Sequence, residues 1–76
     1  MLNPFVYLIR NDDGVQQFYL ESFCVDPRGG KVLFTLEPQE AVSFANWEEA
    51  AAVASFIVFH VDETFSGCLE ISKFIL

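Results

Sequence analysis

The sequence predicts an α+β fold, in which a three- or four-stranded antiparallel sheet in the order β-β-β-α-β carries one helix on a face. Residues 5–36 alternate β-branched and aromatic runs with turn residues, which is typical of a strand meander. A helix-capping residue then precedes apolar residues at helical spacing, and another alternating run follows. A chain of 76 residues can build one hydrophobic core, so we expect a single compact domain over residues 1–76.

The first hairpin is predicted from a strand over Phe5–Arg10, a turn over Asn11–Gly14 and a second strand over residues 15–25. Asn, Asp and Gly accept the positive φ angles that a tight hairpin requires. Alternation along the second strand places every other side chain on the same face. The face that we expect to point inward carries Phe18, Leu20, Ser22 and Cys24.

A second hairpin is expected at Asp26–Gly30, where proline fixes one φ angle and glycine can take the left-handed conformation. Lys31–Leu36 then alternates as a third strand. Glu37 and Pro38 end that strand, because proline has no N–H to donate to a neighbouring strand.

The helix is predicted to begin at Trp47, because the preceding Asn46 is a favoured N-cap residue. Glu49 stands three positions beyond the cap, and Glu48 adds negative charge at the positive end of the helix. The apolar stripe consists of Ala50, Ala51, Ala54, Ile57 and Val58. Residues 56–61 also suit a strand, so the sequence leaves the end of the helix open.

A final strand is predicted over Cys68–Lys73, after a polar connection at residues 62–67. Phe74, Ile75 and Leu76 follow as three apolar residues in a row. We expect this apolar tail to pack against another element or to pair with one.

The composition combines 53% apolar residues with eleven acidic and four basic ones, for a formal net charge of −7. This charge repels phosphate and anionic lipid headgroups, so we expect neither direct nucleic-acid binding nor membrane binding. It favours a protein partner with a basic surface, through an attraction that weakens with salt. Self-association into a homodimer would share the surplus apolar surface. The alternative is that the acidity only keeps a greasy small domain soluble.

Cys24 and Cys68 lack the spacing of a disulfide scaffold, so we expect reduced thiols. Met1–Pro4 shows no basic segment leading into an apolar one, and the longest apolar run, residues 50–59, is shorter than the ~20 residues that span a bilayer. These observations favour a cytoplasmic location.

No catalytic, cofactor or metal site is expected. A nucleophilic pair would need His60 beside Cys24 or Cys68, and nothing in the sequence brings them together. One histidine and two separated cysteines also lack metal-ligand spacing. We therefore expect a protein that is not an enzyme and holds no cofactor.

The candidate protein-binding residues are loop acids, which would steer a basic partner, and aromatic residues expected to be exposed, which would anchor it. They are Asp12, Asp13, Tyr19, Phe23, Glu37, Glu40 and Phe65. Turn and capping roles are an alternative explanation of the acids. A further hypothesis is mimicry of nucleic-acid phosphates, which would require the carboxylates to lie in rows.

The run Tyr7–Arg10 into Asn11–Gly14, then Phe18–Leu20, then Ala41 and Phe44 followed by Glu48–Ala50, resembles small phage-encoded accessory proteins that pack one helix on an antiparallel sheet. Some of these proteins inhibit host defence, and the anti-CRISPR proteins among them are often small, acidic and non-enzymatic. The resemblance implies action in the host-cell cytoplasm. It carries over no family binding residue.

Together, these patterns favour a non-enzymatic protein-binding inhibitor or adaptor. On the resemblance it would be an anti-CRISPR-like protein that blocks a basic nucleic-acid-binding surface of its target. The alternative is a self-assembling structural or virion-associated protein, whose apolar tail adds a strand to a neighbouring molecule.

Overall fold

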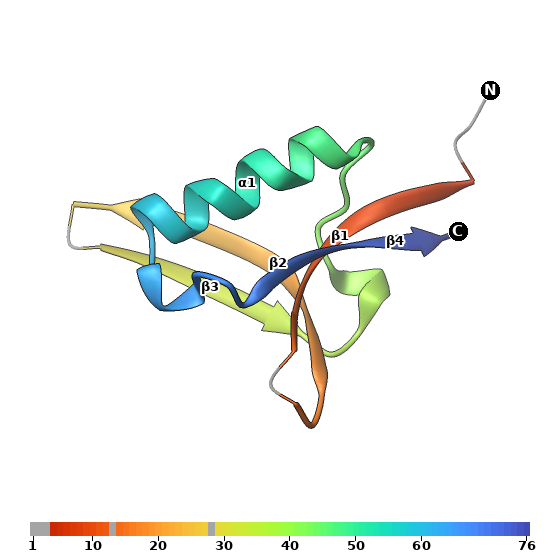
Figure 1. Cartoon of the computed structure of the whole chain (residues 1–76), viewed down its shortest axis with the longest axis horizontal. Coiled ribbons are helices and arrows are strands. Elements are labelled where there is room, and N and C mark those ends of the chain that lie inside the picture. The colour runs from red at the N-terminus through yellow and green to blue at the C-terminus, as the bar shows by residue number, and fades with distance from the viewer. Residues whose placement is uncertain (1–3, 13, 28) are drawn as a thin grey trace.

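A computed structural model describes residues 4–12, 14–27 and 29–76 of the chain (Figure 1). Its elements are β1 (Phe5–Asp12), β2 (Gln17–Asp26), β3 (Gly29–Thr35), the 3-10 turn η1 (Pro38–Glu40), α1 (Trp47–His60), the 3-10 turn η2 (Glu63–Phe65) and β4 (Leu69–Ile75). The strands form one antiparallel sheet in the order β3-β2-β1-β4, and α1 lies across one face. This arrangement confirms the predicted α+β fold with β-β-β-α-β order.

β1 pairs with all of β4, from Phe5 opposite Ile75 to Asn11 opposite Leu69. Its pairing with β2 is limited to residues 10–12, opposite 17–19. Beyond that point the segment between η1 and α1 bonds to both strands. The N–H of Val42 donates to the carbonyl of Leu20 at 2.9 Å, and Phe44 exchanges two backbone bonds of 2.9 Å with Tyr7.

A β-bulge between Leu20 and Ser22 corrects the predicted inward face of β2. A bulge adds one residue to a strand, so the side chains beyond it change faces. Ser22 and Cys24 are therefore exposed, whereas Phe23 packs against the core. The strict alternation in our prediction was wrong after Leu20, and the bulge buries an aromatic ring in place of a hydroxyl.

The two predicted turns differ in how they use glycine. Gly14 has a φ of +90° and its N–H donates to Asp12 Oδ1 at 2.8 Å, as expected for the first turn. Gly30 does not take the left-handed conformation expected at the second turn, because it belongs to β3 and lies opposite Val25. A Cβ atom at Gly30 would stand 2.5 Å from Val61 Cγ1, so close approach of another segment explains this glycine.

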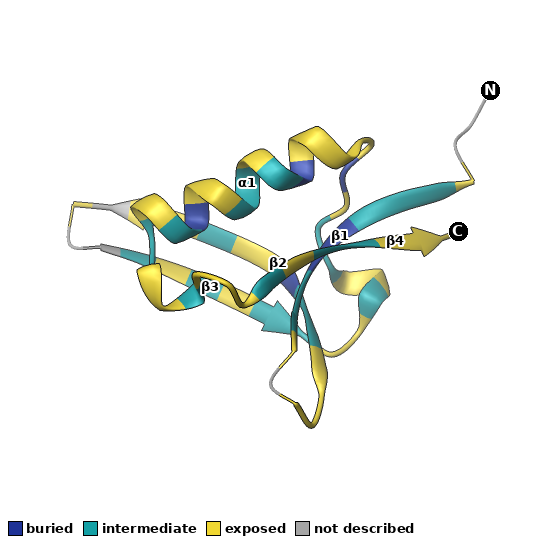
Figure 2. Cartoon of the chain, in the orientation of Figure 1, coloured by how far each residue is buried: buried dark blue, intermediate teal, exposed yellow. Residues whose placement is uncertain are grey.

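The core lies between α1 and the sheet. It is formed by Ile9, Leu20, Phe44, Ala50 and Ile57. Figure 2 shows the buried side of α1 turned toward the strands and the exposed side turned away. Asn46 caps the helix by accepting the N–H of Glu49 at 2.8 Å, as predicted. α1 continues to His60, so residues 56–60, which also suited a strand, are helical. Among residues 4–12, 14–27 and 29–76, the structure contains no helix that is long and apolar enough to span a bilayer.

Candidate functional site

The predicted acids take part in local turns. Asp12 accepts the N–H of Gly14, and Asp13 lies outside the described residues. Glu37 accepts Gln39 Nε2 at 3.0 Å, and Glu40 accepts the hydroxyl of Thr35 at 3.3 Å. Both glutamates are exposed, so these contacts leave their charge in solvent. Their role in binding stays a prediction.

The three predicted aromatic anchors are all half-buried, contrary to the expected exposure. Tyr19 lies on the sheet face opposite α1, and it is the cross-strand neighbour of Arg10 and Thr35. Phe23 lies under the helix, with its ring centroid 5.9 Å from that of Phe56. Phe65 packs against Phe34 at 5.4 Å, because η2 folds back over the sheet.

The structure thus brings Tyr19, Glu37 and Glu40 to one end of the sheet around Thr35. Phe23 and Phe65 contribute instead to the packing beneath and beside α1. The six of these predicted residues that the structure describes therefore do not form one continuous site.

His60 lies on α1, Cys24 on β2 and Cys68 in the turn between η2 and β4, so they belong to three different parts of the fold. The His60 ring packs against Phe56 in a tilted arrangement, with centroids 4.9 Å apart, at the end of α1. Cys24 is exposed on β2, and Cys68 Sγ lies 3.8 Å from the carbonyl oxygen of Thr64. No cluster of three or more possible metal-binding side chains occurs in the described parts of the chain.

The side of α1 that points away from the sheet is unusually apolar. We define the α1 outer face by the exposed residues Glu48, Ala52, Ser55, Phe56 and Phe59, which follow helical spacing. Phe56 lies at the edge of this face, because its ring also packs against Phe23 of the sheet. Between Glu49 and Asp62 the only ionisable side chain is that of His60. Phe59 is 79% exposed and Phe56 is 40% exposed. A solvent-facing helix surface normally carries charged residues, so this face is suited to contact.

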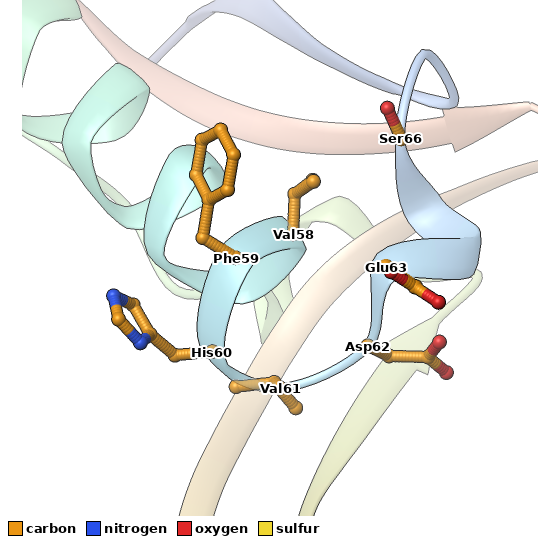
Figure 3. A pocket seen from close by; sticks show the side chains of 7 residues that line it. All are labelled: Val58, Phe59, His60, Val61, Asp62, Glu63 and Ser66. Atoms are coloured by element: carbon orange, nitrogen blue, oxygen red, sulfur yellow. The ribbon is translucent and has the colours of Figure 1, made fainter.

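An open hollow of about 480 Å³ adjoins this face at the end of α1 (Figure 3). Its lining combines apolar groups, including Val58 and Phe59, with the carboxylates of Asp62 and Glu63. Figure 3 shows Phe59 projecting from the helix, and the two carboxylates beyond the end of α1. Glu48 and Glu49 supply further negative charge at the other end of the helix.

This combination matches the chemistry of a lysine or arginine side chain. The aliphatic stem of such a residue can lie along Phe59 and Val58, while its charged head reaches Asp62 or Glu63. The α1 outer face beside the hollow offers apolar contact to the residues around that cation. We call the α1 outer face and the hollow together the α1 site.

No family model, curated protein or solved structure matches the chain. The case for the α1 site therefore depends on its own geometry. The sequence analysis missed this site, although one signal was visible. Residues 50–59 lack any charge, and a helix in a chain of 76 residues cannot bury its whole circumference.

The carboxyl of Asp62 is expected to titrate below its usual range. Thr64 Oγ1 donates to Asp62 Oδ1 at 2.6 Å and Thr64 N donates at 3.0 Å, and both bonds favour the ionised form and lower the pKa. A folded-state pKa below the unfolded value gives stabilisation that is present at neutral pH and is lost as the pH falls through the folded-state pKa. An NMR titration that follows the side-chain carboxyl carbon of Asp62 measures its pKa in the folded protein.

Thr64→Val removes the hydroxyl donor and keeps the backbone N–H, so the pKa of Asp62 should return toward the usual 3.8. An unchanged pKa in this variant would show that the hydroxyl does not hold the carboxylate. At neutral pH, Asp62 keeps a negative charge at the α1 site.

Proposed function

We propose that this protein is a non-enzymatic protein-binding inhibitor or adaptor that uses the α1 site. The observation that carries the proposal is the exposed Phe59 beside the carboxylates of Asp62 and Glu63. Aromatic side chains near the centre of an interface contribute much of its binding energy, and charges at the rim steer the approach. The partner is a protein whose basic surface presents lysine or arginine next to apolar residues.

The net charge of −7 supports a basic partner, because it accelerates association with a positive surface at low salt. A groove that normally holds nucleic acid is one such surface. By covering it, the protein would act as an inhibitor of the anti-CRISPR-like kind. Competition between nucleic acid and this protein for the captured partner tests that mode, and simultaneous binding would exclude it.

The proposed location is the cytoplasm, where free thiols persist. Cys24 and Cys68 are both exposed and unpaired with each other. A cytoplasmic redox balance keeps such thiols reduced. Thiol labelling of the protein in intact producing cells tests this location, and complete protection of both cysteines by oxidation would contradict it.

Phe59→Ser is expected to weaken partner capture by about thirtyfold or more, because a central aromatic anchor contributes about 2 kcal/mol or more to binding. The measurement is capture from lysate followed by titration of the captured protein against each variant. Leu33→Ser is the matched control, since Leu33 is also exposed, at 57%, but lies on the sheet face opposite α1. Equal capture by wild type and Phe59→Ser would refute the proposal.

Charge reversal at two places tests whether acidic residues contribute to capture. Glu63→Lys should weaken capture and reduce its dependence on salt, because it reverses a charge in the hollow. Reversing Glu37 and Glu40 together tests the acids predicted from sequence. If capture is lost only when Glu37 and Glu40 are reversed, the binding surface lies at the end of the sheet around Thr35 and not at α1.

A further inference from the structure

The outer edge of β4 carries backbone groups that no other strand of the described sheet satisfies. The N–H of Leu76 donates to the carbonyl of Pro4 at 2.9 Å, on the β4 side of β1. Tyr7 exchanges its backbone bonds with Phe44 on the other side of β1. Because backbone groups alternate along a strand, the even-numbered residues of β4 bond to β1. The N–H and C=O groups of Leu69, Ile71, Lys73 and Ile75 therefore point outward.

We propose that this edge pairs with β4 of a second copy of the chain, antiparallel and about a two-fold axis at Ser72. In an antiparallel ladder, hydrogen-bonded residues stand directly opposite each other and exchange both bonds. The outward N–H and C=O groups belong to odd-numbered residues, so each odd-numbered residue of one β4 must stand opposite an odd-numbered residue of the other. The register that pairs all seven residues of β4 places Leu69 opposite Ile75 and Ile71 opposite Lys73. Ser72 then faces Ser72 of the second copy.

The same register places Ile75 of the apolar tail against a suitable surface. Ile9 lies in the core beneath α1 and pairs with Ile71, so the odd-numbered side chains of β4 point to the face that carries α1. Ile75, which is 75% exposed in one copy, would stand beside Leu69 of the other copy. Leu69 lines a second hollow of about 190 Å³ with Phe59 and Phe65.

Each copy thus offers Ile75 to the hollow of the other, as an isologous two-fold interface requires. The two Ile75 side chains would be buried at symmetric positions. The hollow lies between the second half of α1, η2 and the start of β4, which is where an antiparallel neighbour would bring the end of its chain.

The distribution of charge permits a second copy at this edge. Two of the four basic residues, Arg10 and Lys73, lie on β1 and β4. Arg10 forms an ion pair with Glu70, and Lys73 Nζ lies 4.2 Å from the centroid of the Phe5 ring. β4 itself contains one acid and one base, so pairing brings no cluster of carboxylates together. The rest of the acidic surface still repels between copies.

Disulfide formation tests the register. In a background of Cys24→Ser and Cys68→Ser, the variant Ser72→Cys should form a covalent dimer under mild oxidation. Ser72 and its copy would be a non-hydrogen-bonded pair, whose Cα atoms are about 4.5 Å apart and within the range of a disulfide. Leu33→Cys in the same background is the control, because Leu33 lies on β3 at the other edge of the sheet.

A mixing experiment makes the test more specific, because the register places Glu70 opposite Phe74 of the second copy. Glu70→Cys and Phe74→Cys should each crosslink poorly alone and efficiently when mixed in equal amounts. Crosslinking of Ser72→Cys no faster than Leu33→Cys would overturn the proposal. So would strong crosslinking of Glu70→Cys with itself.

Sedimentation measures the association without any introduced cysteine. Wild type should dimerise at micromolar concentration, and Ile75→Lys should raise the dissociation constant by about tenfold or more, because the change occurs twice in the dimer. Added salt should strengthen this dimer by screening the repulsion between two chains of −7, whereas it should weaken binding to a basic partner. If the wild type stays monomeric at micromolar concentration, with or without added salt, the dimer is refuted and the proposed function is unaffected.

Discussion

Ile57→Ala is expected to lower the free energy of unfolding by about 2–5 kcal/mol, which is the range for truncating a buried isoleucine to alanine. Ile57 has no exposed surface, and it belongs to the core between α1 and the sheet. The substitution removes its apolar contacts and leaves a cavity that the sheet can only partly fill. Urea denaturation at fixed protein concentration measures the change, since dimerisation would make stability depend on concentration.

Phe59→Ala is the matched control on the same helix. It removes a larger side chain, but Phe59 is 79% exposed, and alanine favours helix. The expected change is within about 0.5 kcal/mol. Equal losses in the two variants would mean that α1 does not present Ile57 to the sheet and Phe59 to solvent.

Local patterns were sufficient to predict most of the fold. The strand order along the chain, the turn at Gly14 and the cap at Asn46 each depend on neighbouring residues, and the structure contains all three. The bulge after Leu20 was not predictable in this way, because it depends on what lies on the two sides of β2. Only the helix above the sheet makes burial of Phe23 more favourable than burial of Ser22.

The α1 site was missed for a related reason. Between Ala50 and Phe59 no charged residue marks the solvent side of the helix, so the pattern does not show which apolar side chains outside the stripe are exposed. The sequence therefore predicted Ile57 as part of the apolar stripe, but it did not single out Phe59 as exposed. The anchors proposed from sequence, Phe23 and Phe65, are packed by Phe56 and Phe34, which are distant in the chain.

Gly30→Ala is expected to destabilise the protein by about 1–3 kcal/mol, which is typical of adding a methyl group to a packed position. The new Cβ would stand 2.5 Å from Val61 Cγ1 and 2.9 Å from the carbonyl oxygen of Cys24. The first contact is with a side chain and the second with the backbone of the neighbouring strand, so β3 or the end of α1 has to move. Urea denaturation again measures the cost.

A double-mutant cycle separates the two contacts. Val61→Ala removes Cγ1, which the new Cβ would contact. The loss of stability in the double variant Gly30→Ala with Val61→Ala should therefore be smaller than the sum of the losses in the two single variants. Gly14→Ala is the control, because Gly14 has a positive φ but open space around it, and Val61→Ala should not relieve that strain. Additivity between Gly30→Ala and Val61→Ala would contradict the close approach.

The same contact links the fold to the proposed binding surface. Val61 follows the last turn of α1, and its N–H donates to Ile57 O at 3.0 Å, so its packing against Gly30 fixes where the helix ends over the sheet. Asp62 and Glu63 follow directly and line the hollow beside Phe59. A methyl group at Gly30 should therefore displace these carboxylates, and Gly30→Ala should weaken partner capture even under conditions in which the protein stays folded.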